Sequence, residues 1–220
     1  MARQYRTLEK LRQQLSARLG FGGQAGASSV NAPILNSFLY DAQQQLWEQV
    51  DWHHLIRFAD KTVGYGQRLL EYPQDCDPER VLSVAVYDGV EWLPLARGID
   101  WQHRDPLNTL DRPCRWEMAD QLELHPQADR TYPLRIRYVR KPDRFEGEGD
   151  RASLNDNLIF LHALYNAKLH YRQPDADRYG AQLESELLQV KSRSRGRRVH
   201  RRKIIQSDPY GRAPRAADHV

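Results

Sequence analysis

The chain has 220 residues, of which 40% are hydrophobic and 28% charged, with a formal net charge of +4 at pH 7. This balance, with five Trp and eleven Tyr, is typical of a folded globular protein and excludes a disordered chain. No apolar run is long enough to cross a bilayer, and the charged N-terminal segment lacks the apolar centre of a signal peptide, so we expect folding in a cytoplasm. Two cysteines are too few for a disulfide framework or a zinc site, and we interpret Cys76 and Cys114 as structural.

Two helices are predicted within the first 56 residues. In residues 3–19 leucines recur at steps of three and four residues, so they share one helix face: Leu8, Leu11, Leu15 and Leu19. Residues 20–29 are rich in Gly, Ala and Ser and should form a flexible connection. Asn31 is a suitable N-cap and Pro33 a suitable first-turn residue for a second helix, which ends near Trp52. Its apolar stripe consists of Leu35, Phe38 or Leu39, Ala42, Leu46 and Val50.

The middle third of the chain has the pattern of short antiparallel strands. Turn signals separate three pairs of segments: residues 57–63 and 67–72 around Gly64-Tyr65-Gly66, 81–87 and 91–95 around Asp88-Gly89, and 115–118 and 121–124 around Ala119-Asp120. Each pair is therefore predicted to form a hairpin. Residues 132–140 then alternate, with Leu134, Ile136, Tyr138 and Arg140 on one side of a strand.

Two further helices are predicted after a polar linker at residues 143–157. Residues 158–172 are broadly apolar and form the third helix. Pro174 opens the fourth, in which an apolar stripe recurs at helical spacing: Tyr179, Leu183, Leu187 and Val190. The short link at Gln173 and Pro174 makes these two helices an antiparallel hairpin.

This order of elements predicts an α+β fold. A helical bundle of about four helices carries an inserted antiparallel β domain and an extended basic C-terminal arm. The predicted divisions are residues 1–56 for the N-terminal helices of the bundle, 57–142 for the inserted β domain, 143–190 for the helical hairpin that completes the bundle, and 191–220 for the arm.

The sequence contains no recognisable phosphate loop or metal site. The glycines between residues 20 and 23 follow no predicted strand and precede no Lys-Ser/Thr pair, so they indicate a linker. His53 and His54 are adjacent, and His162 and His170 are eight residues apart. Neither spacing places two side chains on one ion from a helix. We therefore predict no metal and no cofactor.

One acidic cluster needs a separate interpretation. Glu146, Glu148 and Asp150 lie among glycines, which is typical of a solvated loop. A carboxylate pair for glycoside hydrolysis is the alternative, but no motif supports it. We therefore predict no catalytic residue, and we expect that the protein is not an enzyme.

The C-terminal segment has a charge balance unlike that of the remaining chain. Residues 191–220 contain ten Lys or Arg and two acids, a balance of +8, whereas residues 1–190 contain 23 basic and 27 acidic residues, a balance of −4. Such a run is either a solvated end or a binding arm, and the apolar residues within it favour the arm. The predicted binding residues are Lys191, Arg193, Arg195, Arg197, Arg198, Arg201, Arg202, Lys203, Ile204, Ile205 and Tyr210. Their charge indicates a nucleic acid or an acidic protein surface as partner without deciding between them.

Several motifs, in a fixed order, resemble bacteriophage head-to-tail adaptors. They are Leu70-Glu71-Tyr72-Pro73 with Cys76 and residues 80–84, Asp88-Gly89 with Trp92-Leu93-Pro94-Leu95, Pro113-Cys114-Arg115-Trp116 with residues 122–126, residues 132–138 with Arg140-Lys141-Pro142, and the helical hairpin of residues 157–192. The resemblance covers about residues 30–200. The layout is similar to the tail tubular protein A type of short-tailed phages, and the basic arm to the packaged-DNA stabilisation type.

The resemblance implies a virion structural protein at the neck, assembled in the host cytoplasm. Such adaptors bind the portal protein after DNA packaging, form a ring of copies of themselves (usually a dodecamer), help to retain the genome, and present a platform to tail or nozzle proteins. Packaged DNA passes through the channel, and no membrane is involved. The arm would dock on the portal. Ile204 and Ile205 would add a strand to an exposed sheet edge there.

Two other functions remain as alternatives. The first is a nucleic-acid-binding protein that uses the same basic tail, although the aromatic residues lie mostly outside that tail. The second is a cell-wall hydrolase delivered with the tail, which only the acidic cluster at residues 146–150 supports.

Overall fold

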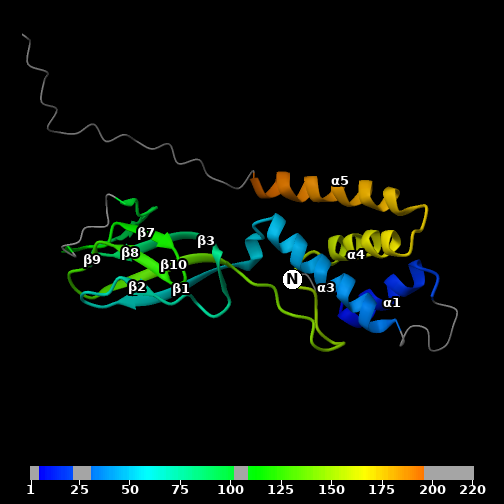
Figure 1. Ribbon diagram of the computed structural model, residues 1–220, viewed down its shortest axis with the longest axis horizontal. Helices are drawn as coiled ribbons and strands as arrows, with labels where there is room; N and C mark the ends of the chain where they lie inside the picture. The colour runs from blue at the N-terminus through cyan, green and yellow to red at the C-terminus, as the bar shows by residue number, and fades with distance from the viewer. Residues whose placement is uncertain (1–4, 22–30, 102–108, 196–220) are drawn as a thin grey trace, which may run out of the picture.

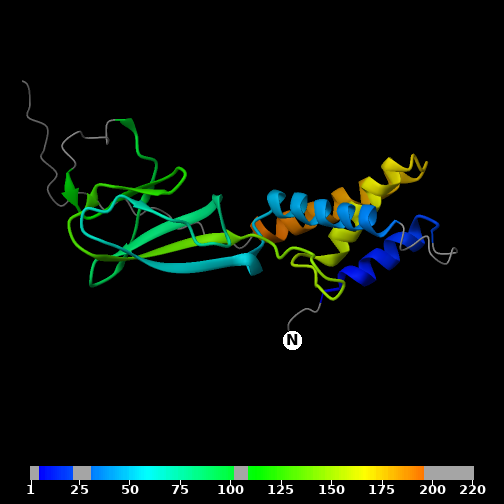
Figure 2. The same cartoon turned by 60° about the horizontal axis from the view of Figure 1, so that its bottom comes forward.

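The described helices gather at one end of the molecule and the β strands at the other (Figures 1 and 2). The structure, a computed structural model, describes residues 5–21, 31–101 and 109–195. The helices are α1 (Leu8–Arg18), α3 (Ala32–Gln49), α4 (Asp156–His170) and α5 (Ala176–Arg195), and a short 3-10 helix η1 (His53–Leu55) follows α3. The α+β fold class predicted from the sequence is confirmed for the described residues.

The helices begin where side chains or loops satisfy their first backbone N–H groups. The side chain of Thr7 accepts a hydrogen bond from the backbone N–H of Lys10 in α1, and that of Asn155 accepts one from Asn157 in α4. Asn31 precedes α3 as predicted, with Pro33 in the first turn, but the side chain of Asn31 makes no capping bond. The predicted first connection, residues 20–29, lies largely outside the described residues.

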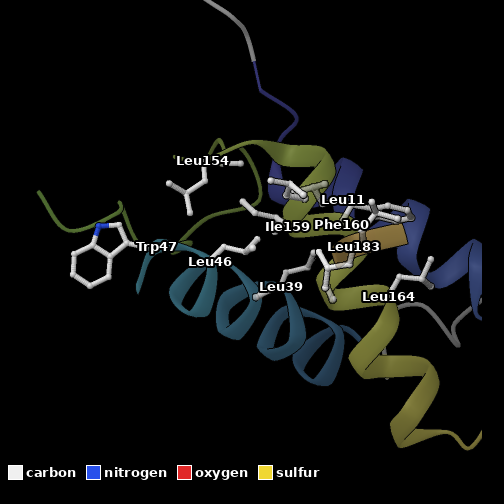
Figure 3. Close-up of a cluster of buried hydrophobic side chains, with 14 of the residues drawn as sticks. Leu11, Leu39, Leu46, Trp47, Leu154, Ile159, Phe160, Leu164 and Leu183 are labelled. Carbon is white, nitrogen blue, oxygen red and sulfur yellow. The ribbon is translucent and has the colours of Figure 1, made fainter. Parts of the chain in front are cut away.

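The predicted leucine faces meet in one hydrophobic core. Leu11 of α1, Leu39 of α3, Leu164 of α4 and Leu183 of α5 converge in the middle of the bundle (Figure 3). Helix α4 packs against each of the other three helices, which explains why its sequence is apolar almost all round. Leu154 joins the same core from the coil before α4, so the predicted polar linker is partly buried.

The strands form two four-stranded sheets and one short pair. The first sheet has the order β1 (Ile56–Val63), β10 (Tyr132–Arg140), β3 (Cys76–Tyr87) and β4 (Trp92–Pro94). The second has the order β2 (Leu69–Leu70), β8 (Leu122–His125), β7 (Arg115–Met118) and β5 (Ala96–Arg97), and β6 (Leu110–Asp111) pairs with β9 (Gln127–Ala128). A second hydrophobic core draws side chains from both larger sheets, including Val84, Trp116, Leu124 and Ile136.

Two of the three predicted hairpins are confirmed. Strands β3 and β4 pair across the turn that begins at Asp88, whose carboxylate accepts bonds from the N–H groups of Val90 and Glu91. Gly89 supplies the positive φ of 109° that this turn requires. Strands β7 and β8 pair across Ala119-Asp120 in the same way.

The third predicted hairpin, around Gly64-Tyr65-Gly66, is wrong. The chain does turn there, because the N–H of Gln67 donates to the carbonyl of Gly64. However, β1 pairs with β10, and β2 pairs with β8 in the other sheet. Gly66 donates to the carbonyl of Ala128, so this turn carries the chain from one sheet to the other. The strand region is also not wholly antiparallel, since β5 with β7 and β6 with β9 are parallel pairs.

One arginine attaches the sheet to the end of helix α3. The guanidinium of Arg80, on β3, donates to the carbonyls of Trp47, Glu48 and Val50 and to the carboxylate of Asp51, each at 2.9 Å. It also lies 4.9 Å from the centre of the Trp47 ring. The last carbonyls of a helix have no partner within the helix and carry partial negative charge, so a cation stabilises them. Arg80 therefore fixes the direction in which α3 meets the sheet.

A second set of bonds ties the exit of the sheet to the same helix. The indole N–H of Trp47 donates to the carbonyl of Arg140 at the end of β10 (2.9 Å). The buried amide of Gln43 donates to the carbonyl of Asp143 and accepts from the N–H of Ser153. The Arg140 guanidinium and the Asp143 carboxylate form a bidentate ion pair, which lowers the pKa of Asp143. Both chain crossings between bundle and sheet are thus braced against α3.

We predict that Arg80→Met lowers the free energy of unfolding by about 2 to 4 kcal/mol, because carbonyls at a helix end lose a charged donor in a partly buried site. Urea denaturation measures this loss. Small-angle X-ray scattering of the same variant should show a wider range of distances between bundle and sheet. Arg112→Met, at an exposed position, is the matched control. A loss within about 0.5 kcal/mol of that control would contradict the role given to Arg80.

Candidate functional site

The predicted binding residues begin inside a helix. Lys191, Arg193 and Arg195 lie in α5, so the helix continues five residues beyond Val190 into the segment predicted as the arm. Lys and Arg are good helix formers, and their charge is favourable at a helix C-terminus, which accounts for the longer helix. The other predicted residues lie outside the described residues: Arg197, Arg198, Arg201, Arg202, Lys203, Ile204, Ile205 and Tyr210.

Helix α5 is held against the bundle by the stripe predicted for it. Leu183 is buried, and Tyr179, Leu187 and Val190 are partly buried against the same core. In both views α5 runs back along α4, so that its last turn lies toward the strands (Figures 1 and 2). The C-terminal end of α5 thereby lies toward the junction of bundle and sheet.

A buried lysine forms the corner between α4 and α5. The ammonium of Lys168 donates to the side-chain carbonyl of Gln173 (2.6 Å) and to both carboxylate oxygens of Asp175 (2.8 Å), and it lies 5.1 Å from the ring centre of Tyr179. Arg172 adopts a left-handed conformation (φ 54°) at the end of α4. These contacts close the hairpin in one geometry. The corner therefore determines where α5 points.

A glycine lets the two helices approach closely. A β-carbon at Gly180 would lie 2.9 Å from Cε2 of Tyr165 on α4, closer than side chains tolerate. Neither this contact nor the Lys168 corner is part of the sequence prediction. The available signals were a lone glycine inside a helical pattern and a lone lysine within an apolar helix.

The residues considered for chemistry serve structural roles where they are described. The Nε2 of His54 lies 2.7 Å from the carbonyl oxygen of Ser153, and burial lowers the pKa of His162. Burial raises the pKa of the Cys76 thiol to about 12, so the thiol stays protonated, whereas Cys114 is exposed. Among the described residues, no group of three or more His, Cys, Asp or Glu is arranged to hold a metal ion.

The acidic loop braces the first helix. The carboxylate of Asp150 accepts bonds from the N–H groups of Glu146 and Gly147, which lower its pKa. Backbone carbonyls of the loop accept from Leu8 and Glu9, and Glu148 forms an ion pair with Arg12 (2.6 Å). The loop is thus more than the solvated segment predicted. It satisfies N–H groups that α1 leaves unpaired at its start.

Comparison with known proteins supplies a family. A family model described as SU10 adaptor protein matches residues 6–204, most of the chain. The match begins before the resemblance noted in the sequence, so it includes α1, and it ends at Ile204 within the basic run. No curated protein matches the chain. In the parts of the chain that the structure describes, no helix is long and apolar enough to span a membrane.

We predict that Asp175→Asn destabilises the protein near neutral pH, because Lys168 then keeps a buried charge without its counter-ion. The ammonium lowers the pKa of Asp175 in the folded state, so the stabilisation is present above the ordinary carboxyl pKa. It disappears as the pH falls through the folded-state pKa. The difference in thermal midpoint between wild type and variant should therefore shrink below about pH 4. Asp41→Asn, on the exposed side of α3, is the control, and an unchanged difference at low pH would refute the role of the ion pair.

Proposed function

Because this chain belongs to the SU10 adaptor protein family, and is therefore a phage adaptor protein, we propose that it forms a ring beneath the portal and joins head to tail. The observation that carries this proposal is the family match over all four helices and both sheets. The role is structural and not enzymatic, and it uses no cofactor. The protein would be located at the neck of the virion and assembled in the host cytoplasm.

Helix α5 and the basic residues after it form the proposed attachment to the portal. The corner at Lys168 sets the direction of α5, and 25 residues follow Arg195. An extended segment of that length reaches up to about 85 Å, enough to follow a neighbouring subunit. Its arginines suit bidentate hydrogen bonds to carboxylates, and its apolar contact residues are Ile204, Ile205 and Tyr210. An arm that folds on its partner pays an entropic cost, but a ring of such arms binds with avidity.

The remaining chain would form the ring and the platform for the tail. Residues 1–190 carry a charge balance of −4, which suits a channel that DNA must leave, since a strongly basic wall would retain it. A dodecamer is the copy number implied by the resemblance to other adaptors. The divisions at residues 56/57, 142/143 and 190/191 stay a prediction, and limited proteolysis of the purified protein tests them.

Binding of the same basic residues to nucleic acid is the alternative. A helix end that carries Lys191, Arg193 and Arg195 would contact phosphates through charge alone, and the affinity would fall steeply with salt. The two functions differ in their partner. The next experiment therefore presents both partners to the same variants.

We predict that a chain ending at Arg195 keeps its thermal midpoint but loses portal attachment at least about tenfold, because α5 and its packing stay while the arm is removed. Negative-stain electron microscopy with the portal protein of the same virus measures the attachment. A chain ending at Ile205 keeps the basic run and both isoleucines and is the matched control, which should dock better.

Normal docking by the chain that ends at Arg195 would show that the arm is not the attachment site. A full-length protein that ignores the portal, yet binds duplex DNA in a salt-dependent way, would favour the alternative.

A further inference from the structure

One face of the sheet formed by β1, β10, β3 and β4 is covered by no described element. Val63, Val84 and Ile136 point from this sheet into the second hydrophobic core. Phe58 lies on the opposite face and is 63% exposed, and Trp92 at the sheet edge is 36% exposed. The four helices lie at the other end of the molecule (Figures 1 and 2) and leave this face open. Large aromatic side chains on an open, ordered face are typical of a binding surface.

The polar residues on this face form an ordered row across the strands. Arg135 on β10 donates two bonds to the carboxylate of Asp60 on β1 (2.6 and 2.7 Å), and its guanidinium lies 4.3 Å from the ring centre of Trp92. The rings of Trp92 and Tyr87 are 5.3 Å apart. Arg137 lies directly opposite Phe58 in the strand register and is exposed.

We call Phe58, Asp60, Tyr87, Trp92, Arg135 and Arg137 the sheet-face row. Asp60, Arg135, Trp92 and Tyr87 contact one another before any partner arrives, which reduces the entropy lost on binding. With one carboxylate against two guanidinium groups, the row is positive. A partner for it should therefore offer acidic and apolar side chains together.

Such a surface lies on the outer side of α5 in the same chain. Asp177, Ala181, Glu184 and Leu188 recur at steps of four, three and four residues, so they share one helix face. All four are exposed, and Leu188 is 65% exposed. Buried Leu183 lies on the opposite face, so this outer stripe points away from the bundle. The outer stripe carries two carboxylates and one large apolar side chain.

The two surfaces match in sign and chemistry. The guanidinium groups of the row would face the carboxylates of Asp177 and Glu184, and Leu188 would pack on Phe58, which lies opposite Arg137 in the strand register. They are different surfaces on one chain, so contact between them is head to tail and repeats from copy to copy. This is the kind of contact that closes a ring.

We propose that the sheet-face row of one copy binds the outer stripe of α5 in the next copy. This contact rests on the proposed ring and defines the interface between its subunits. A second copy is the occupant that the chain itself supplies, since it carries both complementary halves. The proposed contact uses no residue after Leu188, so it does not involve the arm that is proposed to bind the portal.

Reversing one charge on each side tests the contact. Arg137→Glu places a carboxylate opposite Glu184, and Glu184→Arg places a guanidinium opposite the row. Each single variant should lower the fraction of portals that carry complete rings at least about tenfold, and the double variant should restore it. Negative-stain electron microscopy and light scattering with the portal protein measure this. Arg144→Glu, an exposed arginine outside both surfaces, is the control and should assemble normally.

A cross-link gives a second measurement that does not depend on charge. In a Cys114→Ser background, Phe58→Cys combined with Leu188→Cys should form disulfides between copies under mild oxidation, whereas either cysteine alone should not. The buried thiol of Cys76 does not interfere. Covalent ladders on a denaturing gel would support the contact.

The outcomes separate this inference from the proposed function. If both single variants build complete rings and the cysteine pair gives no ladder, the contact is refuted while the adaptor function stands. If the single variants still dock on the portal as isolated copies, the arm and the ring contact act separately, as expected. If wild type itself neither docks nor forms rings, both proposals fail.

Discussion

The structure depends first on the contact between Arg80 and the end of helix α3. The bundle and the sheets have largely separate hydrophobic cores, so little apolar packing fixes the angle between them. Val139 is the one buried residue of the described strands in the bundle core, with Ile56 and Leu82 partly buried against it. Arg80 fixes this angle by donating to three helix carbonyls and one carboxylate at a single point. Trp47 completes the attachment by stacking on Arg80 and donating to Arg140. The proposed adaptor role requires such a fixed angle, because a partner at each end would dock on surfaces far apart in the molecule.

Local patterns in the sequence predicted the elements better than their pairing. Helical periodicity, which depends only on residues three and four apart, predicted α1, α3 and α5, whereas α4 was predicted from its broadly apolar sequence. The hairpin across Asp88-Gly89 was predictable because its two strands are adjacent in the chain. The turn around Gly64-Tyr65-Gly66 was equally visible, but a turn signal does not say which strand pairs next. The actual partner of β1 is β10, and that choice depends on the two cores.

The candidate site was predictable in charge but not in shape. The basic run was evident from its composition, but the boundary of α5 was not, because Lys and Arg continue a helix as readily as they form an arm. The corner at Lys168 depends on Gln173 and Asp175, whose role emerges only when the hairpin closes. The sheet-face row could not be predicted from the sequence either, because Asp60 and Arg135 are distant in sequence and meet only through strand pairing.

The chain enters and leaves the sheets at neighbouring points, since Ile56 at the start of β1 lies opposite Val139 near the end of β10. A short link could therefore join the helices before and after them, provided that it replaces the apolar side chain of Val139 in the bundle core. Such a layout permits exchange of the whole strand region as a unit while the helices stay unchanged. A replacement strand region would need a cationic side chain that binds the end of α3 as Arg80 does. This requirement limits which strand regions are compatible with the helices.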